Sequence, residues 1–244
     1  MRLELLGVSK RYARIDDLTL TIEGERAVAL VGESGSGKST LARLISLLEK
    51  PDAGEIRFDG VSLTGLRGAK RRALRGNIQL ILQNAAAALD PRVRVGKSIA
   101  EPLRNLTRLS AAEISARVNE ICARVSLSPE LLRRLPHELS GGQQKRVCFA
   151  RGLVTHPGFV VFDEVTSGLD PALRERVLEF IVGLKAESLR SFLFITHDMD
   201  AALRVADRVL VMKSGAIVED SIVSGGRAEL RHEYARLLLE KAWS

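Results

Sequence analysis

A glycine-rich sequence in the first quarter of the chain has the composition of a phosphate-binding loop. Residues 32–39 read GESGSGKS and match the pattern G-x-x-x-x-G-K-[ST]. The glycines let the backbone turn its N–H groups towards phosphate oxygens. The lysine would reach the β- and γ-phosphates of a nucleotide, and the following serine hydroxyl would bind Mg²⁺. The nucleotide-binding residues expected here are Gly32, Ser34, Gly35, Gly37, Lys38, Ser39 and Thr40.

A pair of acidic residues after an apolar stretch is the second candidate site. Residues 159–162 read FVVF and lead into Asp163 and Glu164. A carboxylate at the end of a buried strand is placed to hold Mg²⁺, usually through water, when that strand lies beside a phosphate loop. Glu164 would then lie next to the γ-phosphate, where it could polarise an attacking water molecule. Together the two motifs predict a site for cleaving a phosphate from a nucleotide.

Strand-like and helix-like segments alternate around these motifs. Residues 26–31 form an apolar run, typical of a strand buried on both faces of a sheet, and a helix is expected from residue 38 to about residue 48. Pro171 opens another helix that runs to about residue 187. Further strands are expected at 3–8, 18–23, 55–58, 78–82, 159–162, 192–195, 209–212 and 216–219, and a terminal helix at 227–241. This alternation predicts an α/β fold with a mainly parallel sheet.

The middle of the chain has a different character. Between about residues 84 and 139 it contains four prolines with helical patterns between them. Ser110 can cap one of these helices, with Glu113 as its capping-box partner. We interpret this stretch as a helical subdomain inserted into a single domain, residues 1–244. The core with its β subdomain would then comprise about residues 1–83 and 140–244.

Three further motifs point to a family. Residues 139–144 read LSGGQQ, residues 167–170 read SGLD, and residues 195–198 read ITHD. With GESGSGKST and FVVFDE, in this order, they resemble the nucleotide-binding subunit of an ATP-binding cassette (ABC) transporter, over essentially the whole chain. The resemblance implies a P-loop ABC cassette with a mainly parallel core sheet, an antiparallel β subdomain and a helical subdomain. It also implies an ATPase whose ligands are ATP and Mg²⁺.

The LSGGQ segment would be a second phosphate-binding element. Ser140 can cap a helix, and two glycines leave the first amide groups of that helix accessible to a phosphate. In the family, two subunits pack head to tail, and each signature segment covers the ATP of the other subunit. The resemblance therefore assigns the partner's ATP to Ser140, Gly141, Gly142 and Gln143.

The remaining roles come from matching positions to the motifs of the family. Gln83 would contact Mg²⁺ or the attacking water and sense the γ-phosphate, and His197 would hold the catalytic geometry. Asp170 would communicate across the dimer, and Tyr12 would stack on adenine. The resemblance thus implies Glu164, His197 and Gln83 as catalytic residues, and Ser39, Gln83 and Asp163 as Mg²⁺ ligands.

The sequence that follows Gln83 resembles one branch of the family. The pattern L-D-P-R…V…I-x-E-P-L at residues 89–103 is similar to that of the peptide/nickel uptake branch. This implies import through separate transmembrane permease subunits, with a solute-binding protein as an indirect partner. It also implies a second ATPase subunit, either a paralogue or another copy of this chain. The chain would then work as a peripheral protein at the cytoplasmic face of the cell membrane.

Composition limits the alternatives. The 244 residues carry 37 Lys and Arg against 30 Asp and Glu, a net charge of +7 that suits an anionic partner. Apolar runs are too short to span a membrane, and Cys122 and Cys148 lack the spacing of a metal site. The alternative function is a non-transport ABC ATPase acting on nucleic acid or ribosomes, although we expect no nucleic-acid partner. Basic residues in the segment 67–75 form either a solvated helix face or a contact with lipid headgroups.

Overall fold

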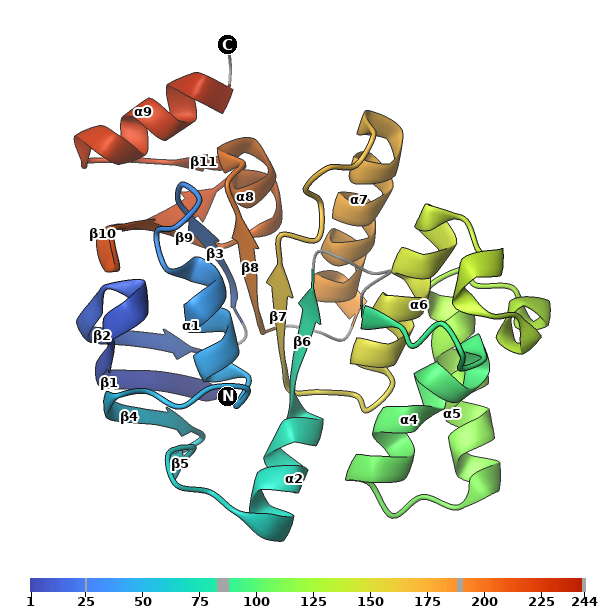
Figure 1. The fold of residues 1–244 in the computed structure, drawn as a ribbon. Coiled ribbons are helices and arrows are strands. Elements are labelled where there is room, and N and C mark those ends of the chain that lie inside the picture. Colours follow the sequence, from blue (N-terminus) through green and yellow to red (C-terminus); the bar gives the residue numbers. More distant parts are fainter. Residues whose placement is uncertain (25, 83–87, 188–190, 243–244) are drawn as a thin grey trace.

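A computed structural model describes residues 1–244 apart from 25, 83–87, 188–190 and 243–244 (Figure 1). The strands are β1 (Arg2–Lys10), β2 (Ile15–Glu23), β3 (Ala27–Val31), β4 (Ala53–Phe58), β5 (Val61–Ser62), β6 (Ile78–Leu82), β7 (Phe159–Asp163), β8 (Phe192–Thr196), β9 (Arg208–Lys213), β10 (Ala216–Ser224) and β11 (Arg227–Ala228). The α-helices are α1 (Lys38–Ile45), α2 (Gly68–Asn77), α4 (Val95–Leu106), α5 (Ala111–Arg124), α6 (Gly141–Leu153), α7 (Pro171–Glu187), α8 (Met199–Val205) and α9 (Glu233–Ala242). Short 3-10 helices are η1 (Arg11–Ala13), η2 (Pro129–Arg133) and η3 (Pro136–Glu138).

The larger sheet is mostly parallel, as the sequence predicts. Among the described residues it has seven strands in the order β11-β10-β9-β3-β8-β7-β6. Strands β6, β7, β8, β3 and β9 run parallel to one another, and β10 and β11 extend the sheet as antiparallel strands. Every residue of β3, β7 and β8 is buried, because helices cover both faces. The carboxyl ends of these parallel strands therefore meet at one edge, where a site can be built.

A smaller antiparallel sheet, in the order β2-β1-β4-β5, packs beside the larger one. One hydrophobic cluster joins Leu5 and Phe58 of this sheet to Leu41 of α1 and Leu30 of β3. On the other face of β3, Val31 belongs to a second cluster with residues of α8 and α9. Helix α1 thus lies between the two sheets (Figure 1), and this packing fixes where α1 begins.

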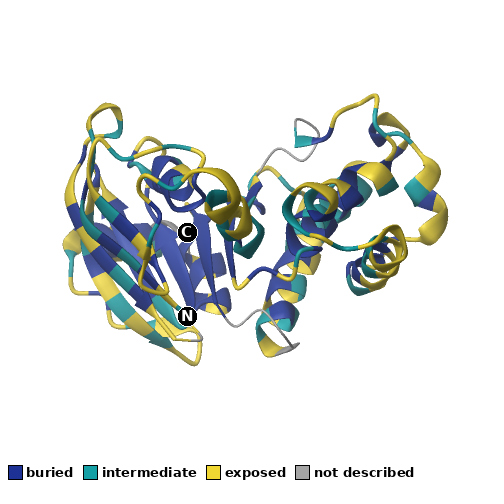
Figure 2. Ribbon diagram, turned by 90° about the horizontal axis from the view of Figure 1, so that it is seen from below, coloured by how far each residue is buried: buried dark blue, intermediate teal, exposed yellow. Residues whose placement is uncertain are grey.

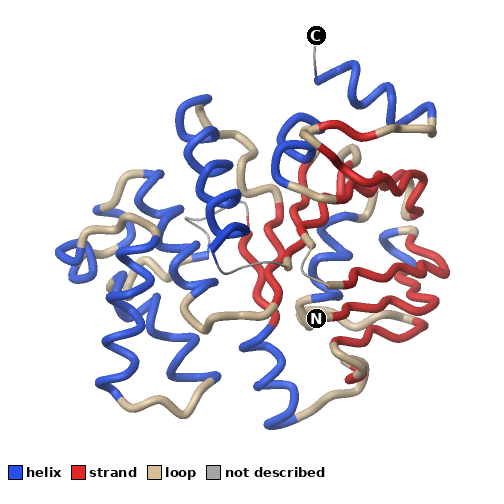
Figure 3. The backbone as a smooth tube through the Cα atoms, turned by 180° about the vertical axis from the view of Figure 1, so that it is seen from behind, coloured by secondary structure: helices blue, strands red, loops and turns tan. Residues whose placement is uncertain are grey.

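Helices α4, α5 and α6 form a separate group beside the sheets (Figure 3). Their contact residues belong to a third hydrophobic cluster, which includes Ile99 of α4, Ile121 of α5 and Val147 of α6. The same cluster extends to Phe162 of β7, so the helical group is packed onto the core sheet. Figure 2 shows the buried sides of these helices facing inward, with exposed residues on the outside. The predicted capping box at α5 is confirmed: Ser110 Oγ accepts from Glu113 N at 3.3 Å, and Glu113 Oε2 accepts from Ser110 N at 2.7 Å.

Several element boundaries differ from those predicted: β1 and β2 are longer, β10 extends to Ser224, and two further differences have a visible cause in the backbone. Residues 227 and 228 form strand β11 and not the start of the terminal helix, because Gly225 and Gly226 (φ +56° and +74°) close a tight hairpin with β10. Helix α1 ends at Ile45, three residues early, since Leu47 adopts a left-handed φ of +61°. No helix within the described residues is long and apolar enough to cross a membrane.

Candidate functional site

The glycine-rich loop joins β3 to α1, at the carboxyl end of a central strand of the larger sheet. Gly35 and Gly37 have φ of +82° and +107°, the left-handed region that favours glycine. A Cβ atom on Gly32 would lie 2.3 Å from the carbonyl oxygen of Met212, so that position also requires glycine. Helix α1 has no side-chain cap and no acidic residue in its first turn. Its first N–H groups are therefore available to a phosphate, and their contact with a nucleotide remains a prediction.

Lys38 is buried inside this loop. Its Nζ donates to the carbonyl oxygens of Gly32 (2.7 Å) and Glu33 (2.8 Å) and lies 4.0 Å from Glu164 Oε1. Burial lowers the pKa of Lys38, although Glu164 and Asp163 act in the opposite direction. A phosphate added beside this amine would favour its charged form. Of the other predicted loop residues, Ser34 is exposed and Thr40 is buried at the start of α1.

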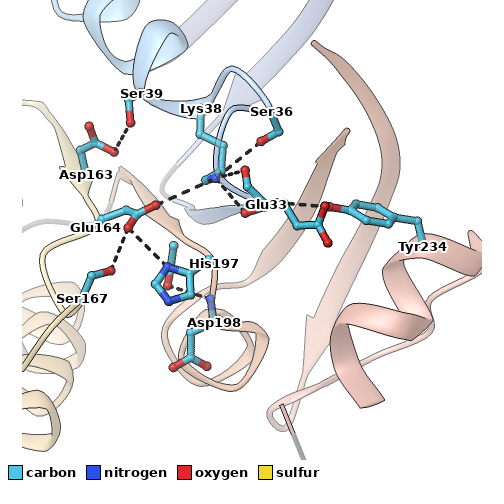
Figure 4. Close-up of polar contacts among 12 residues, drawn as sticks. Glu33, Ser36, Lys38, Ser39, Asp163, Glu164, Ser167, His197, Asp198 and Tyr234 are labelled. Carbon is cyan, nitrogen blue, oxygen red and sulfur yellow. Dashed lines mark hydrogen bonds and ion pairs between the residues drawn. The ribbon is translucent and has the colours of Figure 1, made fainter. Parts of the chain in front are cut away.

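Ser39 and Asp163 form the pair of oxygen donors that the sequence predicts. Ser39 Oγ donates to Asp163 Oδ1 at 3.2 Å (Figure 4). Asp163 is the last residue of β7 and is only 7% exposed. Burial raises the pKa of Asp163, and the Ser39 hydrogen bond lowers it by less. A buried carboxylate beside a hydroxyl suits a hard cation, which would stabilise the charged form of Asp163.

Glu164 lies at the centre of the polar contacts (Figure 4). Its Oε2 accepts from Ser167 Oγ at 2.9 Å and is 3.3 Å from His197 Nδ1. Its backbone N–H donates to the carbonyl of Ile195 at 2.9 Å, which ties it to β8. Glu164 adopts a left-handed φ of +49°, a conformation that costs a residue with a Cβ about 1–2 kcal/mol. This backbone turn aims the carboxylate at both Lys38 and His197.

His197 follows β8 and is more exposed than Glu164. Its side chain is 58% exposed, against 21% for Glu164. The next residue, Asp198, caps α8 through Ala201 N at 3.1 Å and also pairs with Arg174 of α7. These contacts fix the backbone that carries His197. Gln83 lies outside the described residues, but β6, which precedes it, pairs in parallel with β7 and sets Leu82 opposite Asp163.

The signature segment begins α6. Ser140 caps this helix: its Oγ accepts from Gln143 N at 3.3 Å, and its N–H donates to Gln143 Oε1 at 2.9 Å. A Cβ on Gly141 would meet no atom within 4 Å, and one on Gly142 would meet only Leu173 of α7, at 3.5 Å. In the described part of the chain, none of the polar contacts of Lys38, Ser39 or Glu164 involves these four residues. The signature segment thus presents an open helix start that is separate from the phosphate loop.

Asp170 and Tyr12 lie at the periphery. Asp170 Oδ1 accepts from Leu173 N at 3.0 Å at the start of α7. Tyr12 is in η1 and is 62% exposed, with its OH 2.5 Å from Glu49 Oε2. Lys10 Nζ lies 5.5 Å from the centroid of the Tyr12 ring. The ring is accessible for stacking, and its predicted contact with adenine remains a prediction.

Two residues that the motifs do not include contact the site from distant elements. Tyr234 of α9 accepts, through its OH, from the Glu33 N–H of the phosphate loop at 3.2 Å, and Lys213 Nζ lies 4.7 Å from its ring centroid. Lys145 of α6 donates from Nζ to the carbonyl of Val165, next to Glu164, at 2.7 Å. Tyr234 is 201 residues from Glu33, so no local pattern could have indicated its role.

Comparison with known proteins agrees with this geometry. The family model described as "ABC transporter" matches residues 15–167. The "Nickel import ATP-binding protein NikE" of Rhodospirillum rubrum is 42% identical over 96% of this chain and 84% of that protein. The "Glutathione import ATP-binding protein GsiA" of Pectobacterium atrosepticum is 41% identical over 95% of this chain but only 37% of that protein.

Solved structures give the same result. The dimeric structure of MJ0796, a bacterial ABC transporter cassette, superposes with a TM-score of 0.81 at 27% identity, over 91% of this chain and 99% of that one. The cbiO1 protein of Clostridium perfringens, part of the cbiONQ transporter complex, gives 0.80 at 26% identity, over 99% and 92%. This chain belongs to the ABC transporter family, as an ATP-binding cassette. The predicted fold class and the predicted ATPase activity coupled to transport are confirmed.

Proposed function

We propose that this chain is the ATP-hydrolysing subunit of an importer whose transmembrane permease subunits are separate chains. The observation that carries the catalytic part is the Glu164 carboxylate, held by Ser167 and His197 and 4.0 Å from the Lys38 amine. The import part is supported by relatives named for nickel import and glutathione import. The proposed cargo is accordingly a peptide, nickel or a metal chelate.

The arrangement of charges suits hydrolysis of ATP. The γ-phosphate would lie among the loop N–H groups, the Lys38 amine and His197. A water molecule between Glu164 and the phosphorus would give its proton to Glu164 as its oxygen bonds to phosphorus. The bond between the γ-phosphorus and the β–γ bridging oxygen would break, releasing ADP and phosphate. His197 would hold the Glu164 carboxylate in place and contact the γ-phosphate.

Mg²⁺ is the proposed cofactor. Ser39 Oγ and Asp163 Oδ1, 3.2 Å apart, are the protein oxygens that would hold the ion, directly or through water, with Gln83 as a further candidate. Bound there, the ion would neutralise charge on the β- and γ-phosphates. The buried position of Asp163 supports this assignment, because an unpaired carboxylate is costly there.

A head-to-tail pair of subunits completes the proposed site. The phosphate loop and the signature segment of one chain make separate surfaces, and a relative of the same fold is dimeric. In such a pair Ser140, Gly141, Gly142 and Gln143 would cover the ATP bound to the partner, and Asp170 would lie near the shared interface. The partner is either a second copy or a paralogue of this chain.

A groove between the core sheet and the helical group is the proposed docking place for a permease. It encloses about 390 Å³ and is lined by residues of β6, α4 and α6, including Leu80, Glu101 and Cys148. Strand β6 leads directly to Gln83, so a permease loop in this groove would touch the strand that ends at the ATP site. The chain would then work at the cytoplasmic face of the membrane, with a solute-binding protein acting indirectly.

Copurification tests the transport assignment against the nucleic-acid alternative. The tagged chain, purified from detergent-solubilised membranes, is expected to bring down permease chains in a stable complex. Addition of the matching cargo-loaded binding protein should raise ATP hydrolysis by that complex, and the Lys38→Ala variant should not respond. Recovery of nucleic acid or ribosomes in place of permease chains would contradict the proposal.

A further inference from the structure

A cleft between α2 and α4 is lined by arginines and belongs to none of the motifs. It encloses about 530 Å³ and is lined by Gly68, Arg71, Arg72, Arg75, Arg104, Asn105 and Leu106. Four of these seven residues carry a guanidinium group, and none is acidic or aromatic. Helix α2 lies at the lower end of the molecule in Figure 1, next to β6. The cleft therefore presents a concentrated positive charge at the molecular surface.

These positive charges have few partners within the chain. Arg71 donates to the carbonyl of Leu47 at 3.0 Å. In the part of the chain that the structure describes, no carboxylate lies within 4.0 Å of Arg72, Arg75 or Arg104. The nearby Glu101 of α4 is paired with Arg151 at 2.8 Å. The repulsion among the guanidinium groups is thus not offset by an internal ion pair.

The sequence of α2 adds to this repulsion. The helix reads GAKRRALRGN, with no acidic residue and no buried residue, and its N-cap, Arg67, makes no side-chain capping bond. Lys70 and Arg71 lie in the first turn, where the helix dipole disfavours positive charge. An anion at the cleft would relieve both the repulsion and the unfavourable dipole interaction.

We propose that the cleft between α2 and α4 binds the phosphates of anionic lipid headgroups at the cytoplasmic membrane surface. The inference rests on the proposed function, because permease docking in the neighbouring groove would bring this surface to the bilayer. The two hollows are adjacent, because Arg75, Asn105 and Leu106 line both. Arg72 and Arg104 line the cleft but not the groove, so both can contact headgroups while the groove holds a permease loop.

The lining of the cleft favours lipid headgroups over a permease loop or nucleic acid. Cytoplasmic loops of membrane proteins carry an excess of Lys and Arg, so they would be repelled by this cleft. Single-stranded nucleic acid is usually bound with aromatic stacking platforms, and no aromatic residue lines the cleft. The cytoplasmic leaflet, in contrast, is negatively charged and attracts clusters of Lys and Arg.

Vesicle binding by the full chain tests the proposal. Sedimentation is measured with phosphatidylcholine vesicles, alone or containing about a third of phosphatidylglycerol, at about 0.05 M and 0.5 M salt. The double variant Arg72→Glu/Arg104→Glu is compared with Arg133→Glu/Arg236→Glu, which makes the same charge change at exposed positions on η2 and α9. ATP hydrolysis by every variant is measured separately and should be unchanged, which keeps the outcome independent of the catalytic assignment.

The cleft variant should bind anionic vesicles at least about tenfold more weakly than the original chain. The control variant should stay within about twofold, and binding to neutral vesicles should be absent throughout. Equal losses in both variants would overturn the proposal, since net charge alone would then explain binding. It would also be overturned if the cleft variant kept its affinity for anionic vesicles, or if it lost affinity only for a single-stranded oligonucleotide.

Discussion

At the scale of single residues, the site is organised by burial of charge. Lys38 is 3% exposed and Asp163 is 7% exposed, and each has its pKa shifted by burial towards the neutral form. Glu164, more accessible, is held by a hydroxyl and an imidazole. Buried charged groups of this kind lower the free energy of unfolding of the chain without ligand. Binding of a ligand of opposite charge raises that free energy. Changes at these residues should therefore affect stability and ligand binding differently.

Lys38→Ala should lose nucleotide affinity by at least about tenfold, because a charge-assisted contact to phosphate is worth about 1.5–3 kcal/mol. Titration with a fluorescent ATP analogue measures this directly. Lys97→Ala, which removes an exposed lysine of α4, is the matched control and should bind normally. Unchanged affinity in the Lys38 variant would show that the loop is not the phosphate site.

Asp163→Asn should stabilise the chain in the absence of nucleotide, and more so at neutral pH than in acid. The raised pKa of Asp163 means that, from about pH 4 upward, the folded chain binds more protons than the unfolded chain. Its contribution to the free energy of unfolding therefore falls as pH rises through the folded pKa. Denaturation at pH 4 and pH 7 measures the effect, with exposed Asp17→Asn as control. A stability difference that is independent of pH would refute it.

At the scale of elements, two helices outside the phosphate loop contact the candidate site. Helix α9 contacts the loop through the Tyr234 hydroxyl, and α6 contacts the residue after Glu164 through the Lys145 amine. The second contact joins the helix that begins with the signature segment to the loop that carries the catalytic carboxylate. Both helices can therefore influence the phosphate loop and Glu164 of their own chain.

Tyr234→Phe should raise the KM for ATP by up to about fivefold, the worth of one neutral hydrogen bond, with kcat nearly unchanged. The Phe ring keeps the packing of α9, so the substitution removes only the contacts of the hydroxyl with Glu33. Steady-state ATP hydrolysis gives both constants. Tyr12→Phe removes a hydroxyl that bonds Glu49 at the surface and should change neither. An unaltered KM in the Tyr234 variant would exclude support of the loop by α9.

Lys145→Met should lower kcat by about tenfold with little change in KM, because the carbonyl of Val165 loses its partly buried donor while the phosphate loop is untouched. Lys145→Arg should restore part of the rate by supplying another donor. The neighbouring Arg146→Met, which removes a contact with the carbonyl of Ser126, is the control. Equal effects of the two methionine substitutions would indicate a general weakening of α6.

Local patterns predicted the elements, and long-range contacts had to come from the structure. Periodicity and capping residues gave β3, the α5 capping box and the start of α1 correctly. The hairpin at Gly225 and Gly226 was missed, because its pairing depends on β10 extending to Ser224. The contact of Tyr234 with Glu33 depends on how α9 packs on the sheet, which one local sequence does not encode.

At the scale of the whole molecule, the proposed assembly is a pair of ATP-binding subunits, of which this chain is one. It carries one phosphate loop and one signature segment on separate surfaces, and the resemblance to a dimeric cassette supports a pair that shares two ATP sites. Two sets of basic residues in this chain of net charge +7 then have a proposed anionic ligand. Buried Lys38 would bind the nucleotide, and the arginine cleft would bind the membrane surface. The site geometry and the assembly lead to the same expectation, that ATP binding closes the pair and hydrolysis opens it.

The most direct test of the account is ATP turnover and oligomeric state in the Glu164→Gln variant. The substitution keeps the shape of the side chain but removes the base, so ATP should bind and hold a closed dimer while hydrolysis falls by at least about a hundredfold. Turnover and size-exclusion light scattering with Mg²⁺ and ATP measure both properties, with exposed Glu130→Gln as control. Normal hydrolysis by the Glu164 variant would contradict the assignment of Glu164 as the base that activates water.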